Sequence, residues 1–106
     1  MKNIKIIEVP SEIGAGTRGS SLGIEAIKVA ALDFMSNFFI HFPSEKIQDE
    51  NKILYEPIES PYAKRIKGVA AIYDKLSKSI CESMKDNFFP VVLSGDHSTS
   101  GGTIAG

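Results

Sequence analysis

Residues 91–102 of the sequence read VVLSGDHSTSGG. An apolar run enters it, Gly95 allows a sharp turn, and an acid and a histidine follow side by side. The apolar run of residues 88–93 is typical of a strand buried on both faces of a parallel sheet. In such sheets, ligands gather beyond the carboxyl ends of the strands. The stretch therefore predicts a strand that carries Asp96 and His97 to a binding edge.

Outward from this stretch, other segments show strand character. Residues 3–9, NIKIIEV, are rich in β-branched residues and predict a first strand. Residues 38–42, FFIHF, predict a second strand, and residues 52–56 predict a further short one. Residues 11–23 hold many Gly and Ser and are expected to form a loop.

Two segments show helical spacing of apolar residues. The first follows the Gly-rich loop, with Ser20 or Ser21 as a candidate cap, at Ile24, Ile27, Ala31 and Phe34. The second predicts a long amphipathic helix whose apolar face holds Ile66, Val69, Ala70, Tyr73, Leu76, Ile80 and Met84. The alternation of strands and helices predicts an α/β layered fold with a mainly parallel sheet.

Composition limits the function classes. The chain has 106 residues, which suits one domain, and its formal net charge of −1 gives no strong attraction to nucleic acid or to an acidic membrane. The single cysteine, Cys81, excludes an intramolecular disulfide framework and suits a reducing compartment. No segment reads as a signal peptide or a membrane span. We therefore expect a cytoplasmic protein without nucleic-acid or membrane partners.

GAGTRG, residues 14–19, fits the pattern G-x-G-x-x-G of dinucleotide-binding loops. Residues 10–13 separate it from the preceding strand, and FFIHF offers no acid for a ribose, so this interpretation is disfavoured. The alternatives are a plain Gly/Ser loop, or a loop at the rim of a site. At a rim, Arg18 would be available for a substrate carboxylate or for a subunit contact.

The sequence around His97 allows two interpretations of this residue. A neutral imidazole pointing into the crevice would suit a metal ion, and Asp96 would either bind the metal or hold the loop in shape. The other reading is a solvated histidine at the end of a strand. The small residues 98–103 could also form an anion-binding loop. A serine-hydrolase elbow is absent, because Ser98 stands where a glycine is needed. His41 and Cys81 are expected to have structural roles.

The string Ser94-Gly95-Asp96-His97-Ser98 resembles the first metal-binding motif of the ureohydrolase family, which includes arginase, agmatinase and formimidoylglutamase. Family members carry Gly-Gly-Asp-His-Ser there, so Ser94 replaces a glycine. The upstream layout also resembles the family, with a short strand, a Gly-rich loop containing Arg18, and a helix opening at Gly23-Ile24-Glu25.

This resemblance implies a three-layer α/β/α sandwich. It also implies hydrolysis of a guanidino or formimino group of a small molecule, with two manganese ions that activate water. His97 would be a manganese ligand, and Asp96 would support the motif without binding the metal. The family's later motifs, Asp-Ala-His-x-Asp and Asp-x-Asp, do not occur in this sequence. Residues 1–106 are therefore expected to be the N-terminal part of one arginase-like α/β domain, with an incomplete metal site and no activity alone.

An alternative of another class is a small stand-alone α/β binding or assembly domain, in which SGDHSTSGG is an anion-binding loop. In either case, a parallel sheet of so few strands leaves a bare edge. We therefore expect a homo-oligomer. The substrate stays open among arginine, agmatine and formiminoglutamate.

Overall fold

A computed structural model of the chain describes residues 3–15, 18–57, 65–98 and 100–106. In this part, three parallel strands form a sheet in the order β2–β1–β3, with bounds β1 Asn3–Val9, β2 Ser44–Lys46 and β3 Phe88–Ser94. The helices are α1 Leu22–Asp33, α2 Phe38–His41, α3 Ile66–Lys85 and α4 Ser100–Ala105, and a 3-10 helix, η1, spans Asn51–Tyr55.

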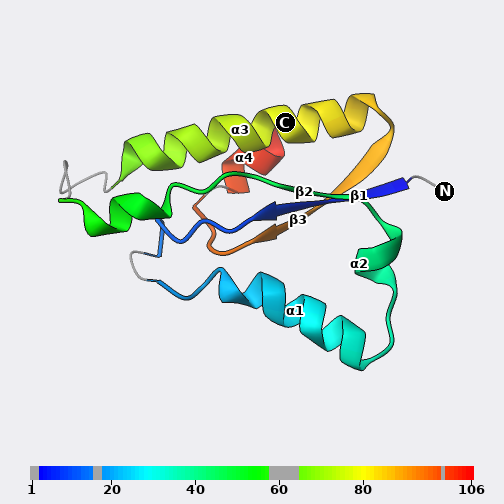
Figure 1. Cartoon of the computed structure of the whole chain (residues 1–106). Helices are drawn as coiled ribbons and strands as arrows, with labels where there is room; N and C mark the ends of the chain where they lie inside the picture. The colour runs from blue at the N-terminus through cyan, green and yellow to red at the C-terminus, as the bar shows by residue number, and fades with distance from the viewer. Residues whose placement is uncertain (1–2, 16–17, 58–64, 99) are drawn as a thin grey trace.

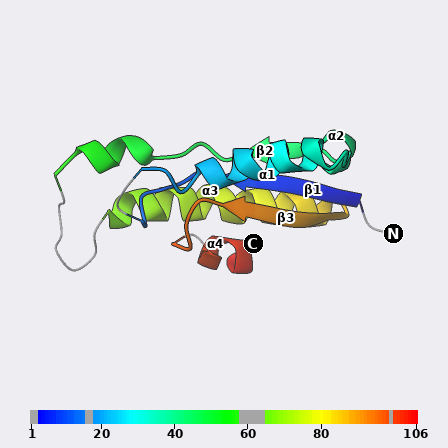
Figure 2. The ribbon, with the colours of Figure 1, turned by 90° about the horizontal axis from the view of Figure 1, so that it is seen from below.

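The elements form three layers. Helix α1 lies on one face of the sheet and the long helix α3 lies on the other (Figure 1). Helix α4 packs beside α3 on the side of the molecule where β3 lies (Figure 2). The predicted α/β fold with a mainly parallel sheet is thus confirmed for the described residues.

The core lies between the sheet and α3. Ile72, Leu76 and Ile80 of α3 are buried and pack against Ile7 and Val9 of β1. Each such side chain stabilises the fold by about 1.5–3 kcal/mol relative to an exposed one. This packing fixes β1 as the central strand and orients its carboxyl end.

The long helix was predicted correctly, but its buried face is rotated from the predicted one. Ile66, Tyr73 and Met84 are 55%, 38% and 56% exposed. Ser79 and Ser83 are buried instead. They fit beneath the helix because Ser79 donates a hydrogen bond to the Glu45 carboxylate and Ser83 donates one to the Ser79 carbonyl oxygen.

The prediction of a second strand at residues 38–42 is wrong. Residues 38–41 form the helical turn α2, and the ring of Phe38 meets the ring of Phe42, which follows the turn, edge-on with the ring centroids 5.1 Å apart. The strand begins just afterwards and pairs Ser44 with Ile6. Strand pairing is made by the backbone, so the polar residues 44–46 can take the place beside β1 without an apolar pattern of their own.

The prediction of a strand at residues 52–56 is also wrong, because this segment forms η1. Asn51 anchors its start through two hydrogen bonds to the segment that leaves β1. The chain then turns tightly, with the Ile53 N–H donating to the Glu50 carbonyl oxygen at 3.1 Å. A fixed Asn51 followed by a tight turn leaves no extended segment to join the sheet.

Strand β3 was predicted to be buried on both faces, and this is wrong for the described part of the chain. It lies at the edge of the sheet, and Phe89 is 55% exposed. The buried strand positions are instead those of β1, from Ile6 to Val9. An edge strand has a neighbour on one side only, so its side chains are covered less.

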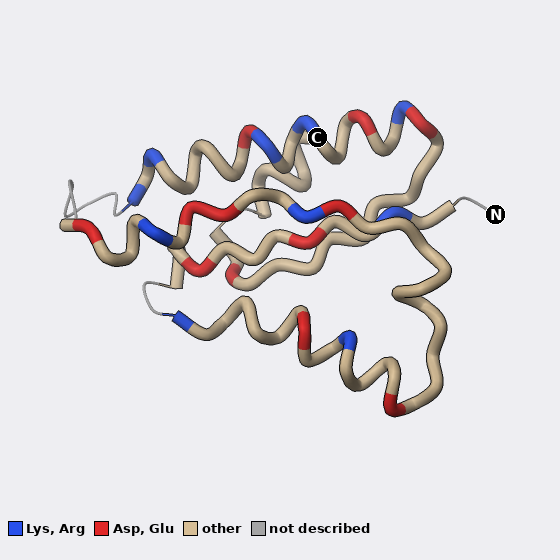
Figure 3. The backbone as a smooth tube through the Cα atoms, in the orientation of Figure 1, with Lys and Arg blue, Asp and Glu red and all other residues tan. Residues whose placement is uncertain are grey.

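Helix α1 forms as predicted but buries little. Its one buried residue is Ile24, whereas Ile27 is 49% exposed and Phe34, just beyond the helix, is 85% exposed. Charged residues are spaced along all of α3 but are few on α1 (Figure 3). The helix therefore presents an apolar outer surface. No helix in the described ranges is long and apolar enough to cross a membrane.

Candidate functional site

The candidate site lies at the carboxyl edge of the sheet, where β1 and β3 end side by side. Val9 is in register with Ser94, and the Gly95 N–H donates to the Val9 carbonyl oxygen at 3.0 Å. The two segments that leave these strands come out at the same edge (Figure 1). A Cβ at Gly95 would lie 2.4 Å from the Ser11 carbonyl oxygen, so only glycine allows this close approach.

Asp96 holds its loop in shape with both carboxylate oxygens. Oδ1 accepts hydrogen bonds from the Ser98 N–H at 2.9 Å and the Ser98 hydroxyl at 2.6 Å. Oδ2 accepts from the Gly14 N–H at 2.9 Å. Asp96 thereby links the loop after β3 to the Gly-rich loop after β1. Of its two predicted roles, this geometry suits the supporting one.

His97 is exposed and lines a pocket of about 280 Å³. The other lining residues are Val92, Ser94, Asp96, Ser100, Thr103 and Ile104. The ring thus lies at the carboxyl edge, where the sequence placed it, and outside the hydrophobic core. Its role as a metal ligand stays a prediction.

The donors around His97 are few. Among the described residues, no group of three or more His, Cys, Asp and Glu side chains could hold a metal ion. Manganese prefers several oxygen ligands, and His97 offers one nitrogen. The described residues could thus supply one ligand of a metal site, but they do not form a complete site.

Sequence reasoning missed Glu12, whose side chain is 1% exposed. Its Oε2 accepts hydrogen bonds from the Gly19 N–H at 2.6 Å, the Ser21 N–H at 2.9 Å and the Ser21 hydroxyl at 3.0 Å. The Arg18 Nε lies 2.7 Å from Oε1 as an ion pair. The Ser21 amide foremost, then the Gly19 amide, the Ser21 hydroxyl and Arg18, outweigh burial and lower the pKa of Glu12.

Asn51 was missed as well, and it joins the start of η1 to the segment that follows β1. Its Oδ1 accepts the Glu12 N–H at 2.7 Å, and its Nδ2 donates to the Pro10 carbonyl oxygen at 2.8 Å. Asn51 is buried, so these bonds are shielded from water. The segment that carries Glu12 is therefore fixed at its start.

A signal for Glu12 does exist in the sequence. A Gly- and Ser-rich loop packed against a sheet holds backbone N–H groups that need acceptors, and Glu12 is the acid at its start. Asn51 had no such signal, because 39 residues separate it from its partner Glu12.

The dinucleotide interpretation of residues 14–19 finds no support. The N–H groups of Gly14 and Gly19 already donate to the carboxylates of Asp96 and Glu12. A pyrophosphate would need such donors for itself. Residues 16 and 17 lie outside the described residues.

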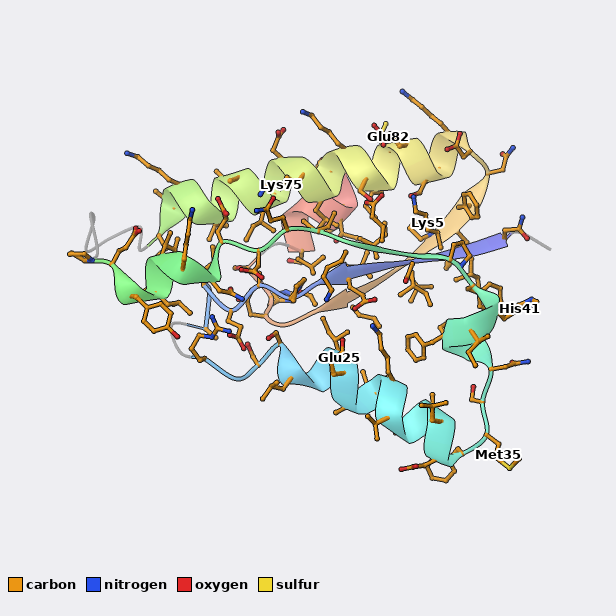
Figure 4. The ribbon with its side chains drawn as sticks, in the orientation of Figure 1. Lys5, Glu25, Met35, His41, Lys75 and Glu82 are labelled. Atoms are coloured by element: carbon orange, nitrogen blue, oxygen red, sulfur yellow. The ribbon has the colours of Figure 1, made fainter. Side chains whose placement is uncertain are left out.

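Arg18, expected at the rim of the site, lies in the Gly-rich loop with its side chain 53% exposed. His41 is not part of the site. It precedes β2 and lies near the amino ends of the strands, at the other end of the sheet from His97 (Figure 4). Its ring contacts Phe42 at 4.8 Å, in a helical turn rather than in the predicted strand. Cys81 is partly buried on α3.

Comparison with known proteins gives a consistent result. The model of the Arginase family matches residues 2–106. An arginase of Brevibacillus brevis is 34% identical in an alignment over 117 residues, and this alignment covers 99% of this chain and 35% of that protein. An arginase of Bacillus caldovelox is 32% identical over 111 residues, covering 100% of this chain and 36% of that protein.

Solved structures agree with the sequence matches. The arginase of Bacillus subtilis superposes with a TM-score of 0.70 at 30% identity, over 99% of this chain and 33% of that one. The Bacillus caldovelox arginase gives a TM-score of 0.69 at 30% identity, over 98% and 36%. The chain thus spans about a third of the length of the relatives it matches.

Proposed function

The chain belongs to the arginase family, and on this premise we propose that residues 1–106 form the N-terminal part of a single arginase-like α/β domain. The complete protein would be a manganese-dependent ureohydrolase that breaks a C–N bond of a guanidino or formimino group. Two findings support this proposal: the family match over residues 2–106, and a superposition that covers about a third of the length of a solved arginase chain.

The observation that carries the proposal is the position of His97. An exposed imidazole lines a pocket at the carboxyl edge of a parallel sheet, where such folds bind their ligands. We assign it as one manganese ligand. Bound manganese would acidify a coordinated water for attack on the planar carbon of the substrate. Asp96 would fix the loop that aims the imidazole, because both its oxygens already accept hydrogen bonds.

The 106-residue chain alone is proposed to be inactive. One imidazole cannot replace the several ligands that a pair of metal ions requires. This agrees with the lack of a three-residue ligand group among the described residues and with the greater length of the relatives. The remaining ligands would come from the rest of the complete protein.

The other parts of the proposal concern substrate, partners and location. Arg18 would meet a substrate carboxylate or a second subunit, and the substrate would be arginine, agmatine or formiminoglutamate. The protein would act on these small molecules without a nucleic-acid or membrane partner. We propose a homo-oligomer because the described sheet leaves an open strand edge. A cytoplasmic location is proposed because a single cysteine suits a reducing compartment.

The test is a metal analysis and a product assay on the complete gene product that contains these residues. We expect bound manganese, and urea release from arginine or agmatine or formamide release from formiminoglutamate. His97→Ala should lower metal content and turnover by orders of magnitude while the circular dichroism spectrum is unchanged.

The matched control is His41→Ala, which removes an exposed histidine at the other end of the sheet and should change neither quantity. Unchanged metal content in His97→Ala would refute the ligand assignment. If the complete protein binds no manganese and releases neither urea nor formamide, the alternative of a stand-alone binding domain would be favoured.

A further inference from the structure

Glu12 is a buried carboxylate that the proposed metal chemistry does not use. An isolated buried carboxylate is costly, so its partners must compensate for lost water. Among the described residues, its partners are Arg18, Gly19 and Ser21, which lie within four consecutive residues of the chain. The carboxylate of Glu12, at the start of the loop, thus binds the backbone of Gly19 and Ser21 later in the same loop.

The same loop is held a second time by Asp96. The Gly14 N–H donates to Asp96, and one residue, Ile13, separates Gly14 from Glu12. Ile13 is 2% exposed and belongs to the hydrophobic core cluster. Glu12, whose carboxylate binds Gly19 and Ser21, and Gly14, whose N–H binds Asp96, therefore lie on either side of one core residue.

A third contact makes this piece of backbone rigid on the Glu12 side. The Glu12 N–H donates to buried Asn51, which also holds the Pro10 carbonyl oxygen. Because Pro10, Glu12 and Ile13 are all held, the chain between the Glu12 carboxylate and the Gly14–Asp96 hydrogen bond is short and fixed.

We propose that Glu12 is a positioning residue that couples the Gly-rich loop to the loop of His97. Its carboxylate sets the path of residues 18–21 and holds Arg18 by Nε. Through Gly14 and Asp96 it also sets the conformation of the His97 loop. The significance of this coupling for catalysis rests on the proposed function, but the coupling itself belongs to the chain described here.

Arg18 is positioned by the same carboxylate. Its Nε faces Glu12 while 53% of the side chain remains exposed, and a guanidinium carries further N–H groups besides Nε. A residue held in this way can meet a carboxylate ligand with little loss of conformational freedom. The coupling thus extends from the rim arginine to the proposed metal ligand.

The experiment measures amide exchange with water by NMR in the 15N-labelled 106-residue chain, without metal or substrate. Glu12→Gln replaces one acceptor oxygen by an N–H₂ group that faces other donors. We expect exchange to rise about fivefold or more at Gly19 and Ser21, which bond Glu12, and also at Gly14 and Ser98, which bond Asp96.

The reciprocal variant decides between coupling and a local role. Coupling between two sites is symmetric, so Asp96→Asn should raise exchange at Gly19 and Ser21 as well. Effects confined to each variant's own partners would overturn the proposal. Glu25→Gln is the matched control, because Glu25 is an exposed acid of α1 and should leave all four amides unchanged.

A variant that merely unfolds is recognised at Ile72 and Leu76, whose amides lie in the core helix. If Glu12→Gln exposes them, Ser21→Ala replaces it, because that change removes one of the Glu12 bonds. The same two-sided pattern is then expected at smaller size, and its absence rejects the coupling. These measurements use neither manganese nor substrate. A negative result would therefore refute the coupling without refuting the proposed function, and a failure of the proposed function would not refute the coupling.

Discussion

At the scale of single residues, two glycines of the same chain are expected to respond oppositely to alanine. A Cβ at Gly95 would meet the Ser11 carbonyl oxygen at 2.4 Å, whereas a Cβ at Gly23 has no neighbour within 4 Å. Gly95→Ala should destabilise the fold by about 1–3 kcal/mol through overpacking. Gly23→Ala should stabilise it by up to about 1 kcal/mol, because glycine is a poor helix former.

Urea unfolding of both variants followed by circular dichroism gives the two free energies. An equal and small effect at both positions would mean that the loop after β3, at Gly95, does not approach the segment after β1, at Ser11, as closely as described.

The lowered pKa of Glu12 has a consequence for acid stability. Because the folded-state pKa lies below its ordinary value of 4.5, the carboxylate stabilises the fold above that pH. This contribution is lost as the pH falls through the folded-state pKa. Glu12→Gln has no such group to protonate. We therefore expect the stability difference between wild type and variant to shrink from about pH 7 to about pH 3.

Urea midpoints across this pH range measure the difference. Glu25→Gln is again the comparison, since the Glu25 carboxylate is exposed and pairs with Lys28 at 3.4 Å. A Glu12 difference that stays constant with pH would show that Glu12 gains nothing from its partners in the folded state.

At the scale of elements, an ion pair fastens α1 to the sheet. Lys28 of α1 lies 2.9 Å from the Glu8 carboxylate of β1, which is 4% exposed. Lys28→Met leaves Glu8 buried without its cation and should cost roughly 1–3 kcal/mol, less than a fully buried pair because Lys28 is 28% exposed.

The measurement is amide exchange along α1, which should rise most in this helix, together with the free energy of unfolding. Lys78→Met is the matched control, because Lys78 pairs with Asp74 on the exposed face of α3 and should cost less than about 0.5 kcal/mol. Equal costs for the two variants would mean that Glu8 does not hold α1.

The elements that the sequence predicts correctly carry their information locally. The β-branched run of β1, the apolar run of β3 and the spacing of α3 are each complete within one segment. Strand β2 is different, because its three residues, SEK, have no strand pattern of their own. Its place is decided by backbone pairing with Ile6–Glu8, distant in the sequence. A local pattern cannot show such a pairing.

The same distinction holds for the site. His97 and Asp96 stand in one compact motif after a strand, so the sequence indicates both. Asn51 contributes through a partner 39 residues away, and only the fold brings the two together. The buried face of α3 was missed for a similar reason. Ser79 and Ser83 look like surface residues until Glu45 supplies a partner for one of them.

At the scale of the whole molecule, the described part has covered and uncovered regions. Helix α3 covers one face of the sheet with a continuous core. On the other face, α1 exposes Leu22, Val29 and Leu32 to 68%, 58% and 65%. Met35, just beyond α1, is 92% exposed and projects from the end of the helix (Figure 4). The outer backbone edge of β3 has no neighbouring strand in the described sheet.

These uncovered regions predict self-association of the 106-residue chain. Contiguous exposed apolar side chains and an open strand edge both favour contacts between copies. We expect light scattering after size exclusion to give a mass above that of one chain, 11.5 kDa, rising with concentration. If α1 forms the contact, Leu32→Lys should shift the distribution toward monomer, because the new charge would have to lose its water at the interface. Ile66→Lys, at a 55% exposed position on α3, should not. A single monomeric mass at the highest attainable concentration would contradict the prediction, and equal effects of the two lysines would place the contact elsewhere than α1.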